Sequence, residues 1–198
     1  MTAYQSHSCM EKIIALDRQL FTKLNHEWHS TFFDSLFPIL RTSQTSYVLY
    51  IFLIVFVLLN GGKNKWWWLL FTALTAVLTD FISSDLIKEN IFRLRPCNDD
   101  SLMPPARFLL SYRPKSSSFT SSHAVNHFGL AAFFYYTLRL YFKKWGLLFF
   151  LWAGSIVYAQ VYVGVHFPLD VVAGACIGFL FGYLSARSFN KHYGLVHI

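Results

Sequence analysis

The sequence predicts an all-α fold: a polytopic membrane bundle of five or six helices, with short turns and one long external loop. Composition is the first observation, because 55% of the 198 residues are hydrophobic and 19% are aromatic, well above a soluble domain. Segment length is the second, because a membrane-crossing helix needs about 20 mostly apolar residues. Residues 1–198 form one membrane domain on this interpretation. The five predicted spans are residues 46–60, 66–87, 119–138, 146–163 and 168–186.

Residues 1–45 precede the first span and mix charged with apolar side chains. Their helical spacing predicts an amphipathic helix on the membrane surface. An apolar run at 32–40 is too short to cross and is interrupted by Asp34, Pro38 and Arg41, which favours a re-entrant or interfacial piece. No basic start leads into an apolar run with a cleavage site, so we expect no signal peptide. The apolar positions that carry the helical spacing are Ile13, Leu16, Leu20 and Leu24.

The formal net charge of +7 is spread over short loops, an arrangement that argues against nucleic-acid binding. Basic residues fall in alternate connections, so the positive-inside rule places those connections in the cytoplasm. The basic residues concerned are Lys63, Lys65, Arg139, Lys143, Lys144, Arg187 and Lys191. The segments at 89–118 and 164–167 are then external. We predict a membrane core at 46–187 and a cytoplasmic tail at 188–198.

The segment 89–118 is the longest without helical periodicity, and four prolines interrupt it. Long loops in compact proteins are often functional. A solvated loop and a loop attracted to lipid headgroups remain alternatives. Its five cations are Arg93, Arg95, Arg107, Arg113 and Lys115.

Three further features leave alternatives open. Asp80 lies in a span, on one helical face with Ser84 and Lys88. It either forms a hydrogen bond between helices or positions Lys88, because a carboxylate in hydrocarbon is costly. Cys9 and Cys97 are either free thiols or a disulfide, and Cys176 is a small helix residue. The repeat of Gly174, Gly178 and Gly182 predicts close contact between helices.

Polar residues collect where two predicted spans begin on the external side. Ser121, Ser122 and His123 open the span at 119–138, and a helix start with hydroxyls favours anions. His127 follows one turn later on the same face. His166 lies just before the last span, Pro168 fits its first turn, and Asp170 follows.

These residues suit the chemistry of a phosphate. Lys88 and Arg95 offer a point charge and a two-pronged donor. Histidines near neutral pKa suit a nucleophile and a general acid, and a carboxylate can fix one imidazole's tautomer. The sequence shows no H-E-x-x-H, carboxylate cluster or cysteine pair, so we expect neither a metal nor another cofactor. Phosphoryl transfer through a phosphohistidine is the reaction that gives a role to the cations, the histidines and the carboxylate together.

The chain resembles the type 2 phosphatidic acid phosphatases, membrane lipid phosphatases related to vanadium haloperoxidases. Their signature is a lysine, six residues and Arg-Pro; then Pro-Ser-Gly-His; then Ser-Arg, five residues, His, three residues and Asp. The corresponding positions are Lys88 with Arg95-Pro96, Thr120 to His123, and Ala159-Gln160 with His166 and Asp170. The resemblance runs from about Asp34 to the end of the last span.

The resemblance implies that His166 attacks phosphorus, Asp170 orients it and His123 protonates the leaving oxygen, at an external active-site loop. Lys88, Arg95 and Ser121 would hold phosphate oxygens, with Ser122 and Gln160 beside them. It implies a multi-pass protein of a bacterial-type inner membrane, with the site facing the periplasm or exterior. Undecaprenyl diphosphate ranks first as substrate, before phosphatidic acid, phosphatidylglycerol phosphate and lipid A phosphate. Haloperoxidase chemistry ranks far behind, and the oligomeric state stays open.

Two residues depart from the signature: Ser122 replaces glycine and Gln160 replaces arginine. A charge-assisted hydrogen bond is worth roughly 1.5 to 3 kcal/mol and a neutral one about 1, so losing the arginine weakens catalysis unless another group compensates. The alternative function is a phospholipid-binding membrane protein with weakened turnover. The compensating candidates are Arg93, Arg113, Lys115 and His127.

Overall fold

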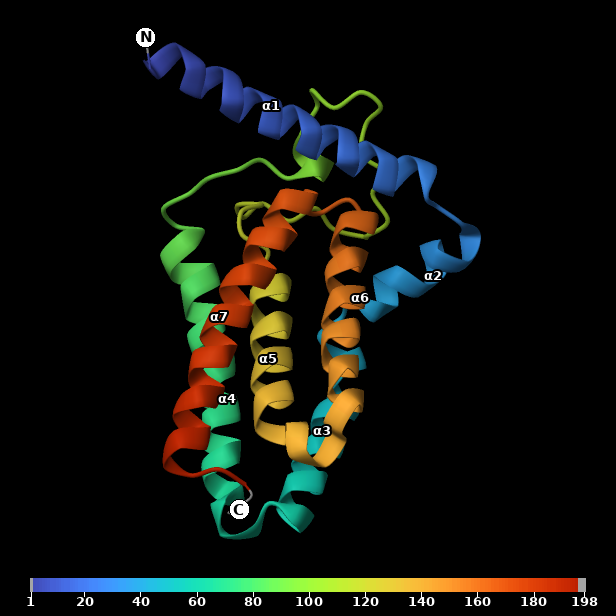
Figure 1. Cartoon of the computed structure of the whole chain (residues 1–198). Coiled ribbons are helices and arrows are strands. Elements are labelled where there is room, and N and C mark those ends of the chain that lie inside the picture. The colour runs from blue at the N-terminus through green and yellow to red at the C-terminus, as the bar shows by residue number, and fades with distance from the viewer. Residues whose placement is uncertain (1, 196–198) are drawn as a thin grey trace.

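The computed structural model describes residues 2–195, with the backbone alone at 2–8 and 43, and this part of the chain is helical without strands. The last residues of the predicted tail, 196–198, lie outside it. Five long helices stand side by side, and α1 lies across one end of them (Figure 1). The predicted all-α bundle is therefore confirmed. The long helices are α3 (Ser43–Asn60), α4 (Lys65–Phe81), α5 (Ser122–Phe142), α6 (Leu148–Tyr162) and α7 (Pro168–His192).

Each of the five long helices lies in a segment that is a candidate to cross a membrane. Three helical stretches are long and apolar enough to cross, namely Gly62–Ile87, Ser122–Tyr162 and Pro168–His192. The second folds back at η5 (Lys143–Leu147), so that α5 and α6 form two antiparallel legs (Figure 1). By length and composition, α2 (Thr31–Leu40) and α3 together are a fourth candidate, bent by 56°, for either a broken span or a re-entrant loop. The short apolar run around Pro38 is a separate helix, and its re-entrant or interfacial placement stays a prediction.

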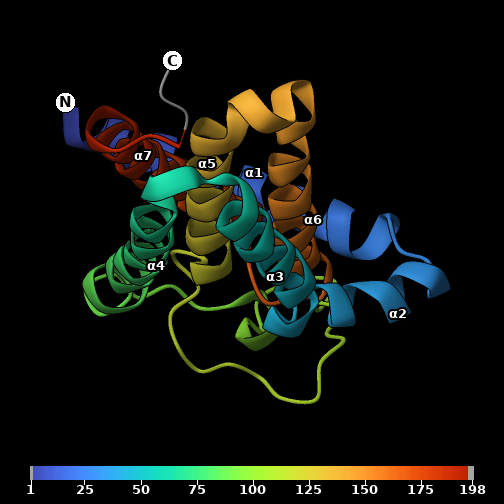
Figure 2. The same cartoon turned by 90° about the horizontal axis from the view of Figure 1, so that it is seen from below.

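Helix α5 lies in the middle of the bundle, with α3, α4, α6 and α7 around it (Figure 2). Glycines bring it against α7. A Cβ at Gly178 would lie 2.1 Å from the carbonyl oxygen of Val125, and one at Gly182 would lie 2.0 Å from that of Gly129. The glycine repeat therefore serves contact within the bundle, as predicted. This contact fixes the start of α5 against the start of α7, where the candidate residues lie.

The N-terminal segment covers the end of the bundle that carries the long loop. Helix α1 (Thr2–Thr22) leads through η1 (Lys23–Glu27) into α2 (Figure 1). It buries Phe21 edge-on against Phe167, whereas Leu16 and Leu20 are exposed. This outward apolar face agrees with an amphipathic helix, and its place on the membrane surface stays a prediction. Asn25 fastens η1 by donating to the carbonyls of Tyr162 and Arg107.

Asp80 links two helices. Its Oδ1 accepts hydrogen bonds from Asn126 Nδ2 at 3.0 Å and from Ser84 Oγ at 3.3 Å, which joins α4 to α5. Lys88 instead donates to Ser122 Oγ, just after η3 (Ile82–Ile87). The interpretation of Asp80 as a hydrogen bond between helices is confirmed.

The basic residues counted for topology follow the same pattern in space. The α3–α4 turn, the α5–α6 turn and the end of α7 share one end of the molecule, and the long loop lies at the other (Figure 1). Assigning the basic end to the cytoplasm stays a prediction. Helix α7 continues through His192, so the segment from 188 begins inside a helix. Cys9 and Cys97 are free thiols, the first exposed and the second buried.

Candidate active site

A tight turn between α6 and α7 presents His166. Gly164 has φ of +84°, and a Cβ there would lie 2.5 Å from the carbonyl oxygen of Arg107. Only glycine fits this approach without strain. The turn leaves His166 directly before α7, and its side chain is 3% exposed. The close approach of this turn to the long loop at Arg107 therefore accompanies the burial of the ring.

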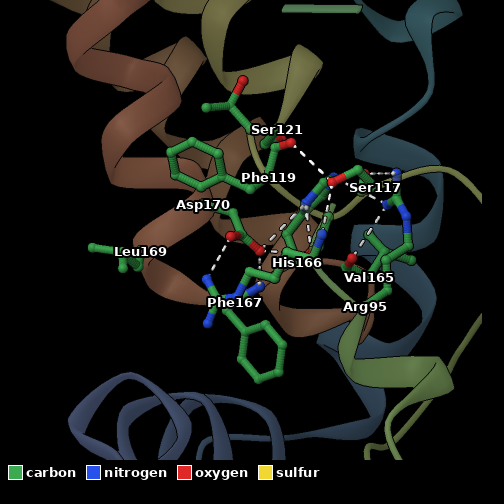
Figure 3. Close-up of polar contacts among 12 residues, drawn as sticks. Arg95, Ser117, Phe119, Ser121, Val165, His166, Phe167, Leu169 and Asp170 are labelled. Atoms are coloured by element: carbon green, nitrogen blue, oxygen red, sulfur yellow. Dashed lines mark hydrogen bonds and ion pairs between the residues drawn. The ribbon is translucent and has the colours of Figure 1, made fainter. Parts of the chain in front are cut away.

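The two ring nitrogens of His166 face different partners (Figure 3). Nε2 lies 3.2 Å from Arg95 Nη1, a donor, so Nε2 carries the lone pair and Nδ1 the proton. Nδ1 lies 3.4 Å from Ser118 Oγ and 3.8 Å from Asp170 Oδ2. Burial lowers the pKa of His166 to about 4, against the opposing effect of Asp170. The imidazole is neutral at pH 7, which is the nucleophilic form.

Asp170 is fully buried and accepts hydrogen bonds at both oxygens. Oδ2 accepts from Ser118 Oγ at 2.6 Å and from the backbone N–H of Phe167 at 2.9 Å. Oδ1 accepts from Arg93. Ser118 thus stands between Asp170 and His166, donating to the carboxylate while its oxygen faces Nδ1–H. The carboxylate orients the ring through this hydroxyl as well as by its charge.

Two cations approach the nucleophile from the long loop and from the end of η3. Arg95 is 6% exposed and holds the loop by donating to the carbonyl oxygens of Ser116 and Val165. Lys88 Nζ donates to Ser122 Oγ. Burial, and then the neighbouring charge of Arg95, lowers the pKa of Lys88 to about 8. A bound anion would relieve the repulsion between these cations.

The start of α5 contributes three neighbouring residues in different ways. Ser121 is fully buried and caps the helix, with Oγ accepting from the N–H of Ala124 at 3.5 Å. Its hydroxyl is thus engaged in the cap, and the structure gives it no contact with Lys88 or Arg95. Ser122 instead accepts from Lys88. His123 is half-buried, its ring stacks on that of His127 with the centroids 5.9 Å apart, and it has no hydrogen-bond partner among the described residues.

Gln160 forms a hydrogen bond that the sequence did not predict. Gln160 is fully buried in α6, and its Oε1 accepts from Nε of Arg41 at 3.2 Å. Its Nε2 is buried without a hydrogen-bond partner among the atoms that the structure describes. Arg41 follows α2, far away in the sequence, and was not among the predicted compensating residues.

The four residues predicted to compensate are engaged elsewhere or exposed. Arg93 joins Asp170 to Asp17, on the carboxylate side of His166. Arg113 donates to the carbonyl of Cys97, and Lys115 is exposed. His127 lies one turn into α5, with Nδ1 2.8 Å from the carbonyl oxygen of His123. The structure thus connects none of the four to Gln160.

Three site residues escaped the sequence analysis: Asp17, Arg41 and Ser118. Asp17 accepts from Arg93 and from the N–H of Leu169 at 2.8 Å, so α1 is tied to the start of α7. Arg41 was recorded only as a residue that interrupts the short apolar run, although charges beside membrane segments usually have a function. Ser118 is one of several consecutive serines, and no sequence signal separates it from the others. Among the side chains that the structure describes, no group of three or more His, Cys, Asp or Glu residues could hold a metal ion.

The PAP2 superfamily model matches residues 64–193, which include the starts of α5 and α7. The chain belongs to the PAP2 superfamily. The expected family is therefore confirmed, and the protein is a multi-pass bacterial membrane phosphatase of this type acting on lipid.

Known PAP2 proteins resemble most of the chain. The lipid A 4'-phosphatase of Bacteroides thetaiotaomicron is 32% identical over 182 residues, 88% of this chain and 77% of that protein. The lipid A 4'-phosphatase of Porphyromonas gingivalis is 28% identical over 188 residues, covering 90% and 78%. The undecaprenyl-diphosphatase of Sulfolobus acidocaldarius is 32% identical over 117 residues, 59% of this chain and 53% of that protein.

Two solved PAP2-type structures share the fold. LpxE of Aquifex aeolicus has a TM-score of 0.61 and 27% identity, over 85% of this chain and 93% of that one. The transmembrane phosphatidylglycerolphosphate phosphatase of Bacillus subtilis has a TM-score of 0.67 and 19% identity, over 92% and 88%. At that identity the second likeness concerns the fold alone.

Proposed function

We propose that this PAP2 protein hydrolyses a lipid-linked phosphate through a phosphohistidine at His166. The observation that carries the proposal is the orientation of the His166 ring, whose two nitrogens face different groups. Nε2 faces the cation of Arg95, where an anionic phosphate would lie, and Nδ1–H faces Ser118 and Asp170. A neutral imidazole oriented in this way is an activated nucleophile.

In the first step, Nε2 of His166 forms a bond to phosphorus and the bond from phosphorus to the lipid oxygen breaks. His123 gives its proton to the leaving oxygen, and Asp170 stabilises the positive charge that develops on His166. In the second step, His123 takes a proton from water, whose oxygen attacks phosphorus. The P–N bond then breaks and inorganic phosphate leaves. Lys88 and Arg95 stabilise the phosphoryl oxygens during both steps.

The 4'-phosphate of lipid A is the substrate that we now rank first. Undecaprenyl diphosphate held that rank on sequence grounds, and the relatives do not confirm it. The two lipid A 4'-phosphatases match 90% and 88% of this chain, whereas the undecaprenyl-diphosphatase matches 59%. Undecaprenyl diphosphate, phosphatidic acid and phosphatidylglycerol phosphate follow as alternatives.

One observation favours a second function, that of a phosphate-binding protein with little turnover. Gln160 is neutral, and its buried Nε2 has no partner among the described residues, as expected if the pocket were altered for binding alone. Release of phosphate by the purified protein distinguishes the phosphatase from the phosphate-binding protein.

The experiment compares the full chain in detergent with His166→Ala, using lipid A and the three alternative lipids in a chelator. We expect phosphate release by the parent to be greatest with lipid A. We expect none with His166→Ala, and an acid-labile phosphoryl label on the parent protein alone. His192→Ala is the matched control, because His192 is exposed near the end of α7.

Each outcome has a definite meaning. Full release by folded His166→Ala contradicts the phosphohistidine mechanism. A parent protein that binds lipid phosphate without releasing it supports the binding function. Faster release from undecaprenyl diphosphate than from lipid A restores the earlier ranking.

A further inference from the structure

Gln160 presents a buried donor without a partner. Its side chain is fully buried in α6, Oε1 accepts from Arg41, and Nε2 has no partner among the described residues. An unsatisfied buried donor destabilises a protein by about 1–3 kcal/mol. A ligand acceptor that reached Nε2 would remove this cost. The donor therefore points to an oxygen-rich ligand at this place.

Arg41 brings an uncompensated charge to the same place. Its Nε donates to Gln160, and its two Nη groups have no hydrogen-bond partner among the backbone and side-chain atoms that the structure describes. Arg93 and Arg107, by contrast, are paired with carboxylates. No carboxylate of the described residues pairs with Arg41, Lys88 or Arg95. Three unpaired cations in one region favour an anion.

The positive charge of Arg41 affects the pKa of Arg95. Burial and then the positive charge of Arg41 lower the pKa of Arg95, which donates to His166. Arg41 is half-buried at the end of α2, so its guanidinium is available to a ligand as well as to the protein.

We propose that Arg41 binds the phosphate group of the substrate, and that Gln160 positions Arg41 and donates its free amide N–H to the same phosphate. The proposal rests on the phosphatase function proposed above. It assigns the cation missing at position 160 to a residue 119 positions earlier in the chain. The ligand chemistry is a phosphate oxygen, from either a lipid headgroup or inorganic phosphate.

The test measures kcat and KM for lipid A, together with inhibition by inorganic phosphate, for the full chain in detergent. We expect Arg41→Met to lower kcat/KM by roughly ten- to hundredfold, the loss of one charge-assisted hydrogen bond. Inhibition by inorganic phosphate should weaken as well. Arg187→Met is the matched control, because Arg187 is exposed near the end of α7.

An exchange variant separates phosphate binding from a structural role. Arg41→Gln combined with Gln160→Arg moves the cation to the other residue of the pair, so we expect kcat/KM to recover most of the loss seen with Arg41→Met. Folded Arg41→Met with kcat/KM and phosphate inhibition within twofold of the parent overturns the proposal. If Arg41→Met does not fold, a folded exchange variant without activity overturns it.

The two proposals fail in different ways. If the parent protein shows no turnover, the phosphatase proposal fails, and inorganic phosphate binding still tests Arg41. Weaker phosphate binding by Arg41→Met then supports the Arg41 site without catalysis. If the parent turns over lipid and Arg41→Met does so equally well, only the Arg41 proposal fails.

Discussion

Replacing Arg93 by methionine should destabilise the protein and slow catalysis together. Its guanidinium donates to Asp170 through Nη1 and to Asp17 through Nη2. These carboxylates have exposed fractions of 0% and 4%, whereas Arg93 is 21% exposed. Arg93→Met leaves both carboxylates buried without their cation.

The expected magnitude follows from what each carboxylate retains. Removing one partner of a buried ion pair costs about 3–5 kcal/mol. Asp170 keeps hydrogen bonds from Ser118 and the N–H of Phe167, and Asp17 keeps one from Leu169. Because these remain, we take the lower end, about 3 kcal/mol. For a chain of this size, 1 kcal/mol shifts Tm by about 2–4 °C, so Tm should fall by about 6–12 °C.

The assay is thermal unfolding in detergent, followed by tryptophan fluorescence, with kcat measured below the transition. Lys115→Met is the control, since Lys115 lies in the same loop and is exposed. Asp17→Asn removes one of the two charges that Arg93 neutralises, so Arg93→Met should cost less in that background. A Tm within 2 °C of the parent, with unchanged kcat, would refute the reasoning.

Two further predictions concern pH and packing. Because the pKa of His166 is lowered to about 4 and that of Lys88 to about 8, kcat/KM should fall as pH drops through about 4, and loss of the Lys88 charge should lower it further as pH rises through about 8, in addition to the fall caused by deprotonation of the general acid His123. Below the first value His166 is protonated and cannot attack, and above the second Lys88 loses its charge. Lys88→Arg should move the upper limit of kcat/KM to higher pH. An upper limit that stays in place in this variant contradicts its assignment to Lys88. Gly178→Ala should destabilise the α5–α7 contact by about 1–3 kcal/mol, because its Cβ would lie 2.1 Å from the carbonyl oxygen of Val125. Gly154→Ala, with nothing within 4 Å of its Cβ, should leave Tm unchanged in the same unfolding assay, and equal Tm values for the two variants would count against the packing argument.

The sequence was sufficient to locate the long helices because a membrane segment must satisfy its backbone hydrogen bonds internally. Residues 66–87, for instance, correspond to α4 and η3, which end at Ile87. Helix ends outside the hydrocarbon were less predictable. Helix α7 runs beyond Ala186 through Arg187 and Lys191 to His192, because hydropathy marks the membrane boundary and a helix can continue into water.

The site was predictable where residues lie in local patterns. His166, Pro168 and Asp170 share one helix start, so their proximity follows from backbone geometry alone. Arg41 and Gln160 are 119 residues apart, and Arg93 and Asp17 are 76 apart. Contacts of this kind depend on how helices pack, and they leave no periodic trace in the sequence.

The cations near the site show why charge composition alone does not describe the long loop. Two of its five cations, Arg93 and Arg107, neutralise Asp170, Asp17 and Asp34. These two arginines hold α1, α2 and the start of α7 in place. The charge left for a phosphate belongs instead to cations without a carboxylate, and one of these, Arg41, lies outside the loop. Affinity for an anion in this bundle therefore depends on which cations the fold leaves unpaired, and a count of basic residues per segment does not measure it.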